Sequence, residues 1–230
     1  MPGSFASSPL VKICGITRAD QAQQIVTLGA DALGFICVPT SARYLDPDQI
    51  RCILETLPRF SRAKQPLLSV GVFADASLET IAQTLALSQL NSVQLHGNED
   101  LDYCLTLKQS HPHLTLIKAF RVKDQKTLYQ AQRYGSAVDF FLFDAFHAQA
   151  LGGSGQTWDW TWLDPVPMAR PWWLAGGLTP ENLQKALVNC APAGIDLSSG
   201  VEVEPGIKDL EKVTQLFRLL ALPDPTSHPV

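Results

Sequence analysis

The chain has 230 residues, of which 46% are hydrophobic and 17% charged, so it carries enough apolar material for a sizeable core. Its net charge of −4 argues against general nucleic-acid binding, which needs clustered Lys and Arg side chains. No run approaches the ~20 consecutive apolar residues that a membrane helix needs, and residues 1–9 lack the basic and apolar regions of a secretory signal. We expect no nucleic-acid or membrane partner, and a short frayed leader over 1–9.

The number and spacing of the cysteines indicate the redox compartment of the protein and whether a metal site is expected. The five cysteines are odd in number and widely scattered: Cys14, Cys37, Cys52, Cys104 and Cys190. The sequence has no Cys-x-x-Cys pair and no Cys/His cluster with metal-ligand spacing. A reduced cytoplasmic protein without a metal site is therefore expected, in preference to a disulfide scaffold.

Short apolar runs alternate with amphipathic stretches along the whole chain. Eight such runs are predicted to be strands: 10–14, 32–38, 67–73, 92–96, 114–120, 139–145, 172–177 and 194–200. Most are apolar at every position, as expected of strands that are buried on both faces of a parallel sheet. Amphipathic helical patterns separate them, and the last two helical patterns cover 181–190 and 208–221.

Eight strand-helix units in a chain of this length predict one α/β domain over 1–230, a single (β/α)8 TIM barrel. A doubly wound open sheet is the structural alternative. The long connection 145–160 is expected to be functional, and the Pro-rich tail 223–230 is expected to be disordered. Trp172 and Trp173 must place their rings on opposite faces of one strand, and the sequence does not say which ring packs inward.

Glycines follow the seventh and eighth predicted strands. Gly176 and Gly177 end the seventh, where Thr179 is a plausible N-cap before Pro180. Ser198, Ser199 and Gly200 end the eighth. Barrel enzymes commonly bind a phosphate between these two loops, on backbone N–H groups. We interpret the two loops as a phosphate site, the alternative being glycines that only serve tight turns.

Two groups at strand ends have acid-base character. Cys14 ends the first strand, where it is either a small buried hydrophobe or a thiol activated by a positive environment. Asp144 ends the sixth strand in an otherwise apolar run. It is either a loop cap or a carboxyl with a raised pKa that acts as a general acid.

Three further residues near strand ends have less decided roles. Arg43 follows the second strand and either pairs bidentately with a ligand carboxylate or forms a surface ion pair. His96 ends the fourth strand and is either structural or functional. Gly155 lies in a glycine-rich segment of the long connection, which is either a phosphate loop or a flexible lid and is not a Walker motif.

Segments spread from about residue 10 to about residue 209 resemble the phosphoribosylanthranilate isomerase family of tryptophan biosynthesis. In chain order, they are 12–15 (KICG), 41–43 (Ser-x-Arg), 70–73 (VGVF), 94–97 (QLHG), the strand end at Asp144, 153–157 (GSGQT), 174–178 (LAGGL) with 180–182 (PEN), and 196–202 (DLSSGVE). The opening KICG and the closing DLSSGVE are the most specific. The departures are small: Trp158 replaces the usual phenylalanine, and Ala74-Asp75 replaces the commoner Val-Asn.

The resemblance implies a (β/α)8 barrel that catalyses an Amadori rearrangement without cofactor or metal. The substrate would be N-(5′-phosphoribosyl)anthranilate and the product the corresponding 1-deoxyribulose aminoketose. By the resemblance, Asp144 is the general acid that opens the ribose ring and Cys14 is the general base that takes the C2′ proton.

The resemblance also implies the binding residues. Arg43 would pair with the anthranilate carboxylate, and the loops at 176–177 and 198–200 would hold the phosphate, with a contribution from Gly155. Asp196 would orient ribose hydroxyls or serve only as a buried cap. Because no second domain is predicted, we expect a stand-alone enzyme, as a monomer in preference to an oligomer.

Three other functions fit the pattern less well. A histidine-pathway aminoaldose isomerase would carry aspartate in place of Cys14 and a second phosphate loop in its first half. Indole-glycerol-phosphate synthase would need lysines at strand ends, and Lys118 is counted as the one lysine inside a strand. A catalytically silent phosphate-binding barrel would have no reason to combine Cys14, Arg43 and Asp144.

Overall fold

The computed structural model describes residues 9–61, 64–145, 160–163 and 166–221. Eight parallel strands pair in sequence order and close into a barrel through the pairing of β8 with β1. The strands are β1 Leu10–Cys14, β2 Ala32–Ile36, β3 Leu68–Phe73, β4 Ser92–Leu95, β5 Thr115–Val122, β6 Phe140–Ala145, β7 Trp172–Leu174 and β8 Gly194–Leu197. The predicted barrel is confirmed, and the open-sheet alternative is wrong.

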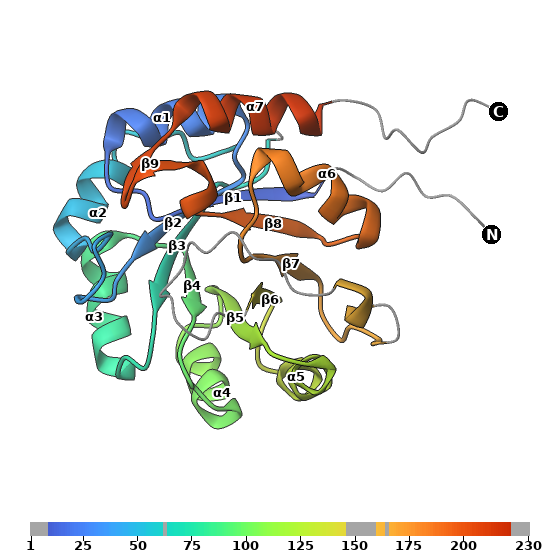
Figure 1. The fold of residues 1–230 in the computed structure, drawn as a ribbon. Helices are drawn as coiled ribbons and strands as arrows, with labels where there is room; N and C mark the ends of the chain where they lie inside the picture. Colours follow the sequence, from blue (N-terminus) through green and yellow to red (C-terminus); the bar gives the residue numbers. More distant parts are fainter. Residues whose placement is uncertain (1–8, 62–63, 146–159, 164–165, 222–230) are drawn as a thin grey trace.

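Helices surround the barrel (Figure 1). They are α1 Ala19–Leu28, α2 Pro47–Leu54, α3 Leu78–Ser88, α4 Leu101–Ser110, α5 Gln125–Ala131, α6 Pro180–Asn189 and α7 Leu210–Leu220, with 3-10 turns η1 Gln132–Tyr134, η2 Trp160–Leu163 and η3 Ser199–Val201. In the described part of the chain, β6 is followed by η2 rather than by an α-helix. A small hairpin, β9 Glu202–Glu204 and β10 Ile207–Lys208, was not predicted.

Local sequence explains where several helices begin. Asp46 caps α2 in a reciprocal capping box with Gln49, and Pro47 occupies the first turn. Ser77 and Asp100 cap α3 and α4 by accepting hydrogen bonds from backbone N–H groups in the first turn. The predicted N-cap at Thr179, with Pro180 first in α6, is confirmed.

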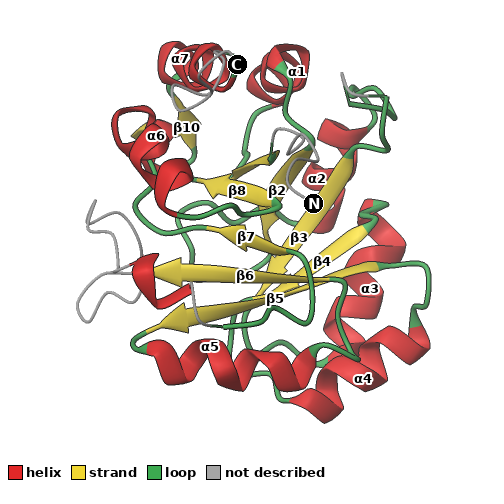
Figure 2. Ribbon diagram, turned by 90° about the vertical axis from the view of Figure 1, so that its right-hand side faces the viewer, coloured by secondary structure: helices red, strands yellow, loops and turns green. Residues whose placement is uncertain are grey.

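The core has two parts, one on each face of the strands. The larger part lies between strands and helices, and the close packing of α4 and α5 against one side of the barrel is visible in Figure 2. The smaller part fills the barrel interior and consists of Ala32, Val70, Ile117, Ala119, Leu142, Trp173 and Ala175. Trp173 is the inward ring of the tryptophan pair, and Gly194 makes room for it, because a Cβ there would lie 2.9 Å from the indole.

No helix of the described residues is long and apolar enough to cross a membrane. The predicted tail, and the predicted leader up to residue 8, lie outside the described residues.

Candidate active site

The loops after β7 and β8 lie against each other. Gly176 and Gly177 both adopt positive φ, +85° and +66°, which favours glycine. A Cβ on Gly200 would overlap the carbonyl oxygen of Leu178, so only glycine allows this approach. The two predicted phosphate loops are therefore neighbours, and their glycines are required by both backbone conformation and close contact.

Backbone donors are available at the second of these loops. The turn η3 begins at Ser199, directly after β8. In the part of the chain that the structure describes, no backbone carbonyl accepts from the N–H groups of Ser199 and Gly200. The first N–H groups of a helical turn have no partner within it and can bind an anion. The Asn182 side chain accepts from Thr179 N and donates to Gly177 O, which fixes the neighbouring loop.

Cys14 lies at the end of β1 with its thiol inside the barrel, and it is 6% exposed. Gly34 on β2 provides the space, because a Cβ there would lie 2.6 Å from Cys14 Sγ. Burial raises the pKa of the Cys14 thiol, while the Lys12 and Lys208 ammonium groups act in the opposite direction. The net shift is upward, so the resting residue is a neutral thiol.

A layer of buried polar side chains crosses the barrel below the mouth. Lys12 Nζ lies 2.8 Å from Asp196 Oδ2 and 2.9 Å from Gln94 Oε1. The Lys12 side chain is completely buried. Burial alone would lower the pKa of Lys12, but the Asp196 carboxylate and Cys14 outweigh it, so the pKa is raised. Lys12 is a buried cation beside Cys14.

Asp144 and His96 meet at the mouth. His96 Nε2 lies 3.2 Å from Asp144 Oδ2, and His96 Nδ1 lies 2.8 Å from Gln94 Nε2. Both side chains keep about a quarter of their surface exposed. The predicted residues Cys14, His96, Asp144 and Asp196 thus line one barrel interior, connected through Lys12 and Gln94.

Arg43 forms a partly buried ion pair with Glu202. Its Nε and Nη2 donate to the Glu202 carboxylate at 2.5–3.2 Å, and Lys208 Nζ donates to Oε1 of the same carboxylate at 2.7 Å. Lys208 also donates to the carbonyl of Cys14. A Cβ on Gly15 would meet Arg43 Cδ at 2.7 Å and Ser198 Oγ at 3.3 Å, so Arg43 lies between the first and last strand ends.

The two lysines of the described barrel strands, Lys12 and Lys118, have opposite orientations. Lys118 points out of the barrel and pairs with buried Glu99 at 3.0 Å, whereas Lys12 points inward. Counting Lys118 as the one strand lysine was therefore wrong, since Lys12 lies in β1. The Lys118–Glu99 pair fastens the loop after β4, because Lys118 donates to Gly97 O and Glu99 accepts from Gly97 N.

Sequence reasoning missed four members of the site: Lys12, Gln94, Glu202 and Lys208. A signal existed for the first two. Lys12 precedes Cys14 by two residues and Gln94 precedes His96 by two, so each shares an inward strand face with a candidate. Glu202 and Lys208 belong to a hairpin that had no strand pattern. Gly155 and most of the connection 145–160 lie outside the described residues.

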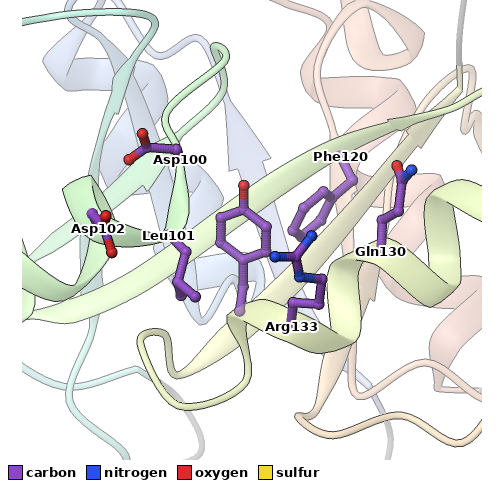
Figure 3. Close-up of a pocket in the computed structure, with 7 residues that line it drawn as sticks. Asp100, Leu101, Asp102, Phe120, Gln130 and Arg133 are labelled. Atoms are coloured by element: carbon purple, nitrogen blue, oxygen red, sulfur yellow. The ribbon is translucent and has the colours of Figure 1, made fainter.

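A separate surface hollow of about 440 Å³ lies between α4 and α5 (Figure 3). Leu101 and Asp102 of α4, Phe120 of β5 and Arg133 of η1 contribute to its lining. None of the candidate residues lines it. Among the described residues, no three His, Cys, Asp or Glu side chains group closely enough to hold a metal ion.

Comparison with known families agrees with this arrangement. The family model described as N-(5′-phosphoribosyl)anthranilate (PRA) isomerase matches residues 11–218, which is nearly the whole chain. The chain belongs to the PRA isomerase family. The histidine-pathway isomerase, indole-glycerol-phosphate synthase and silent-barrel alternatives are set aside.

Related proteins cover the same span. The PRA isomerase of Acaryochloris marina is 52% identical over 208 residues, 90% of this chain and 96% of that protein. The crystal structure of the PRA isomerase from Thermotoga maritima has a TM-score of 0.80 at 34% identity, covering 91% of this chain and 97% of that chain. A further PRA isomerase structure, in complex with reduced 1-(o-carboxyphenylamino)-1-deoxyribulose 5-phosphate, has a TM-score of 0.77 at 34% identity, with 91% and 97% coverage.

Proposed function

We propose that this chain converts N-(5′-phosphoribosyl)anthranilate into 1-(2-carboxyphenylamino)-1-deoxyribulose 5-phosphate in tryptophan biosynthesis, with Cys14 as general base and Asp144 as general acid. Membership of the PRA isomerase family gives the reaction. The observation that supports the two roles is the presence of a buried thiol and a carboxyl that is about a quarter exposed in one barrel mouth, linked through buried polar side chains.

The chemistry requires one proton donor and one proton acceptor. Asp144 protonates the furanose ring oxygen, the C1′–O bond breaks toward that oxygen, and the nitrogen lone pair forms an iminium ion. Cys14, as thiolate, then removes the C2′ proton, and the C–H electron pair gives an enolamine that tautomerises to the ketone. Because the iminium ion is an electron sink, a modest base is sufficient for the second step. The Lys12 and Lys208 ammonium groups favour the thiolate, which is nevertheless the minor form of Cys14 because burial raises the pKa of its thiol.

Three substrate groups have matching residues. The phosphate is assigned to Gly176, Gly177 and the segment 198–200, where the N–H groups of Ser199 and Gly200 have no backbone acceptor among the described residues. Gly155 remains part of this proposal. The ribose hydroxyls are assigned to Asp196, whose buried Oδ1 has no hydrogen-bond partner among the described residues. The anthranilate carboxylate is assigned to Arg43, whose Nε edge is held by Glu202.

Loss of substrate fluorescence tests the proposal directly. Purified protein is mixed with N-(5′-phosphoribosyl)anthranilate, and we expect its fluorescence to fall at a rate proportional to enzyme concentration. A control contains the same protein after heat denaturation. An unchanged signal at high enzyme concentration would refute the isomerase activity.

Two further properties are proposed with this function. We place the enzyme in the cytoplasm, since the proposed base is a free thiol that must stay reduced. We also propose a monomer, because one barrel contains every assigned residue. A structure from the family is described as monomers generated from a dimeric Thermotoga maritima enzyme. Sedimentation equilibrium tests the oligomeric state: a monomer has the mass of one chain, and a dimer has the mass of two.

A further inference from the structure

Four side chains form a continuous hydrogen-bonded chain across the barrel, from β1 to β6. Lys12 Nζ contacts Gln94 Oε1 at 2.9 Å, Gln94 Nε2 contacts His96 Nδ1 at 2.8 Å, and His96 Nε2 contacts Asp144 Oδ2 at 3.2 Å. Lys12 and Gln94 are almost fully buried, at 0% and 1% exposure. Water therefore does not compete for the hydrogen bonds of Lys12 and Gln94. Each donor in this inner half of the series must meet an acceptor on the neighbouring side chain.

The chemistry of Lys12 gives this chain a direction. An ammonium group has three donors and no acceptor, so the Gln94 amide must present its oxygen to Lys12. The amide nitrogen, which only donates, then faces His96 Nδ1. This orientation follows from donor and acceptor types and does not depend on telling the amide oxygen from the nitrogen.

The direction fixes the tautomer of His96. Because Nδ1 receives a hydrogen from Gln94, Nδ1 must be the acceptor and the ring hydrogen must be on Nε2. Nε2 then donates to Asp144 Oδ2. A hydrogen on Nδ1 would point at the N–H donors of the Gln94 amide and leave this contact without an acceptor.

We propose that Lys12 and Gln94 are positioning residues that hold His96 with its hydrogen on Nε2, so that Asp144 keeps its acid proton for the substrate. The inference rests on the proposed role of Asp144 as general acid. With Nε2–H against Oδ2, the acid hydrogen of Asp144 is on Oδ1. It passes to the ribose ring oxygen as the C1′–O bond breaks, and Nε2–H stabilises the carboxylate that remains.

The opposite tautomer would prevent this step. An Nε2 lone pair next to Asp144 would accept the carboxyl proton, giving an imidazolium–carboxylate pair with no hydrogen directed at the substrate. The backbone of His96 is fixed independently of its ring, since His96 N donates to Phe73 O at 2.7 Å and Arg121 donates to His96 O. The tautomer, rather than the position of the loop, is thus what Gln94 controls.

The variant Gln94→Glu tests the inference because it keeps the shape and still satisfies Lys12. A carboxylate accepts from both neighbours, so His96 Nδ1 should carry a hydrogen and Nε2 should take the proton of Asp144. We expect ring-nitrogen NMR to show Nε2–H alone in the wild type and hydrogen on both ring nitrogens in Gln94→Glu. We expect kcat to fall at least tenfold with little change in KM, since general acid catalysis contributes about 10²–10⁴-fold.

Matched controls separate this role from a structural one. Gln215→Glu makes the same chemical change on an exposed face of α7 and should alter neither the His96 spectrum nor kcat. His96→Gln retains a donor toward Asp144 and should keep more activity than His96→Leu.

The wild-type spectrum needs no variant to fold. In the wild type, a hydrogen on Nδ1, or on both nitrogens, at pH 7.5 would overturn the inference. In Gln94→Glu, a hydrogen on Nδ1 together with unchanged kcat would overturn it as well. If the wild type shows Nε2–H but never isomerises the substrate, the tautomer assignment stands and the proposed function fails.

Discussion

The surroundings of Cys14 act on its thiol in both directions. Burial raises the pKa of Cys14, whereas the Lys12 and Lys208 ammonium groups lower it, and burial prevails. A raised pKa means that the thiolate fraction is small at neutral pH and grows as pH rises. Cys14, which the family resemblance assigns as the general base, is therefore a protonated thiol in the free enzyme.

Thiol alkylation measures this balance at the residue scale. We expect the rate of Cys14 modification by iodoacetamide to be low at pH 7 and to rise steadily beyond pH 9, the ordinary value for a cysteine. Lys12→Met should move the rise to higher pH, because it removes the nearest cation. Exposed Cys52, followed by mass spectrometry in the same samples, is the internal control. A Cys14 that reacts faster than Cys52 at pH 7 would contradict a raised pKa.

Arg43 gives a second residue-scale prediction. Arg43→Lys should raise the KM for the substrate by about tenfold, because an ammonium cannot hold Glu202 and a carboxylate with a planar fork. Steady-state kinetics measure KM, and Arg18→Lys is the control, since Arg18 is exposed and pairs with exposed Asp20. An unaltered KM would remove the assigned role of Arg43.

The location of Cys14, Asp144 and Gly200 at strand ends could be predicted from the sequence, while their roles stay predictions. Their partners could not be predicted. Glu202 and Gln94 are ordinary polar residues in the sequence, and only barrel closure places them against Arg43 and Lys12. The pairing of Arg43 with Glu202 spans 159 positions, which no local pattern reports.

At the scale of elements, strands seven and eight end earlier than the sequence predicts, and two glycines explain the end of strand seven. The prediction extended these strands to 177 and 200, but β7 stops at Leu174 and β8 at Leu197. The positive φ of Gly176 and Gly177 turns the chain out of the sheet. The hairpin of β9 and β10 escaped prediction because its strands have only three and two residues, with Gly206 at φ +86° between them.

The contact between the two loops predicts the effect of Gly200→Ala. Its methyl group would push against the Leu178 carbonyl and separate the phosphate loops, so KM should rise about tenfold or more while the barrel still folds. Kinetics with the phosphorylated substrate provide the measurement. Gly29→Ala is the control, because it strains a φ of +128° at the end of α1, away from the site. Equal KM values for both variants would argue against a phosphate site at Gly200.

At the scale of the whole molecule, Glu202 connects the first and last parts of the barrel. It pairs with Arg43 after β2 and with Lys208 of β10. Burial alone would raise the pKa of Glu202, but the hydrogen bonds from Arg43 and Lys208 outweigh it, so the pKa lies below the usual 4.5. The stability from this carboxylate is therefore present above about pH 4.5 and is lost as pH falls through the lowered value.

Glu202→Gln should destabilise the fold by about 3–5 kcal/mol at pH 7, since it leaves the buried Lys208 ammonium and the partly buried Arg43 guanidinium without their carboxylate. The loss relative to wild type should shrink as pH falls below 4.5. Urea unfolding at pH 7 and pH 4 gives both values. Glu204→Gln, exposed on the same hairpin, should change stability at neither pH. A pH-independent difference for Glu202→Gln would show that its charge is not the cause.

The central claim is that Cys14 acts as general base and Asp144 as general acid in one barrel mouth. Single-turnover kinetics test it most directly. With enzyme in excess over N-(5′-phosphoribosyl)anthranilate, we predict rapid fluorescence loss for wild type and for Cys52→Ala, and a rate at least about 100-fold lower for Cys14→Ala and Asp144→Ala. Circular dichroism should show that both variants remain folded. A folded Cys14→Ala or Asp144→Ala enzyme with the wild-type single-turnover rate would contradict the account.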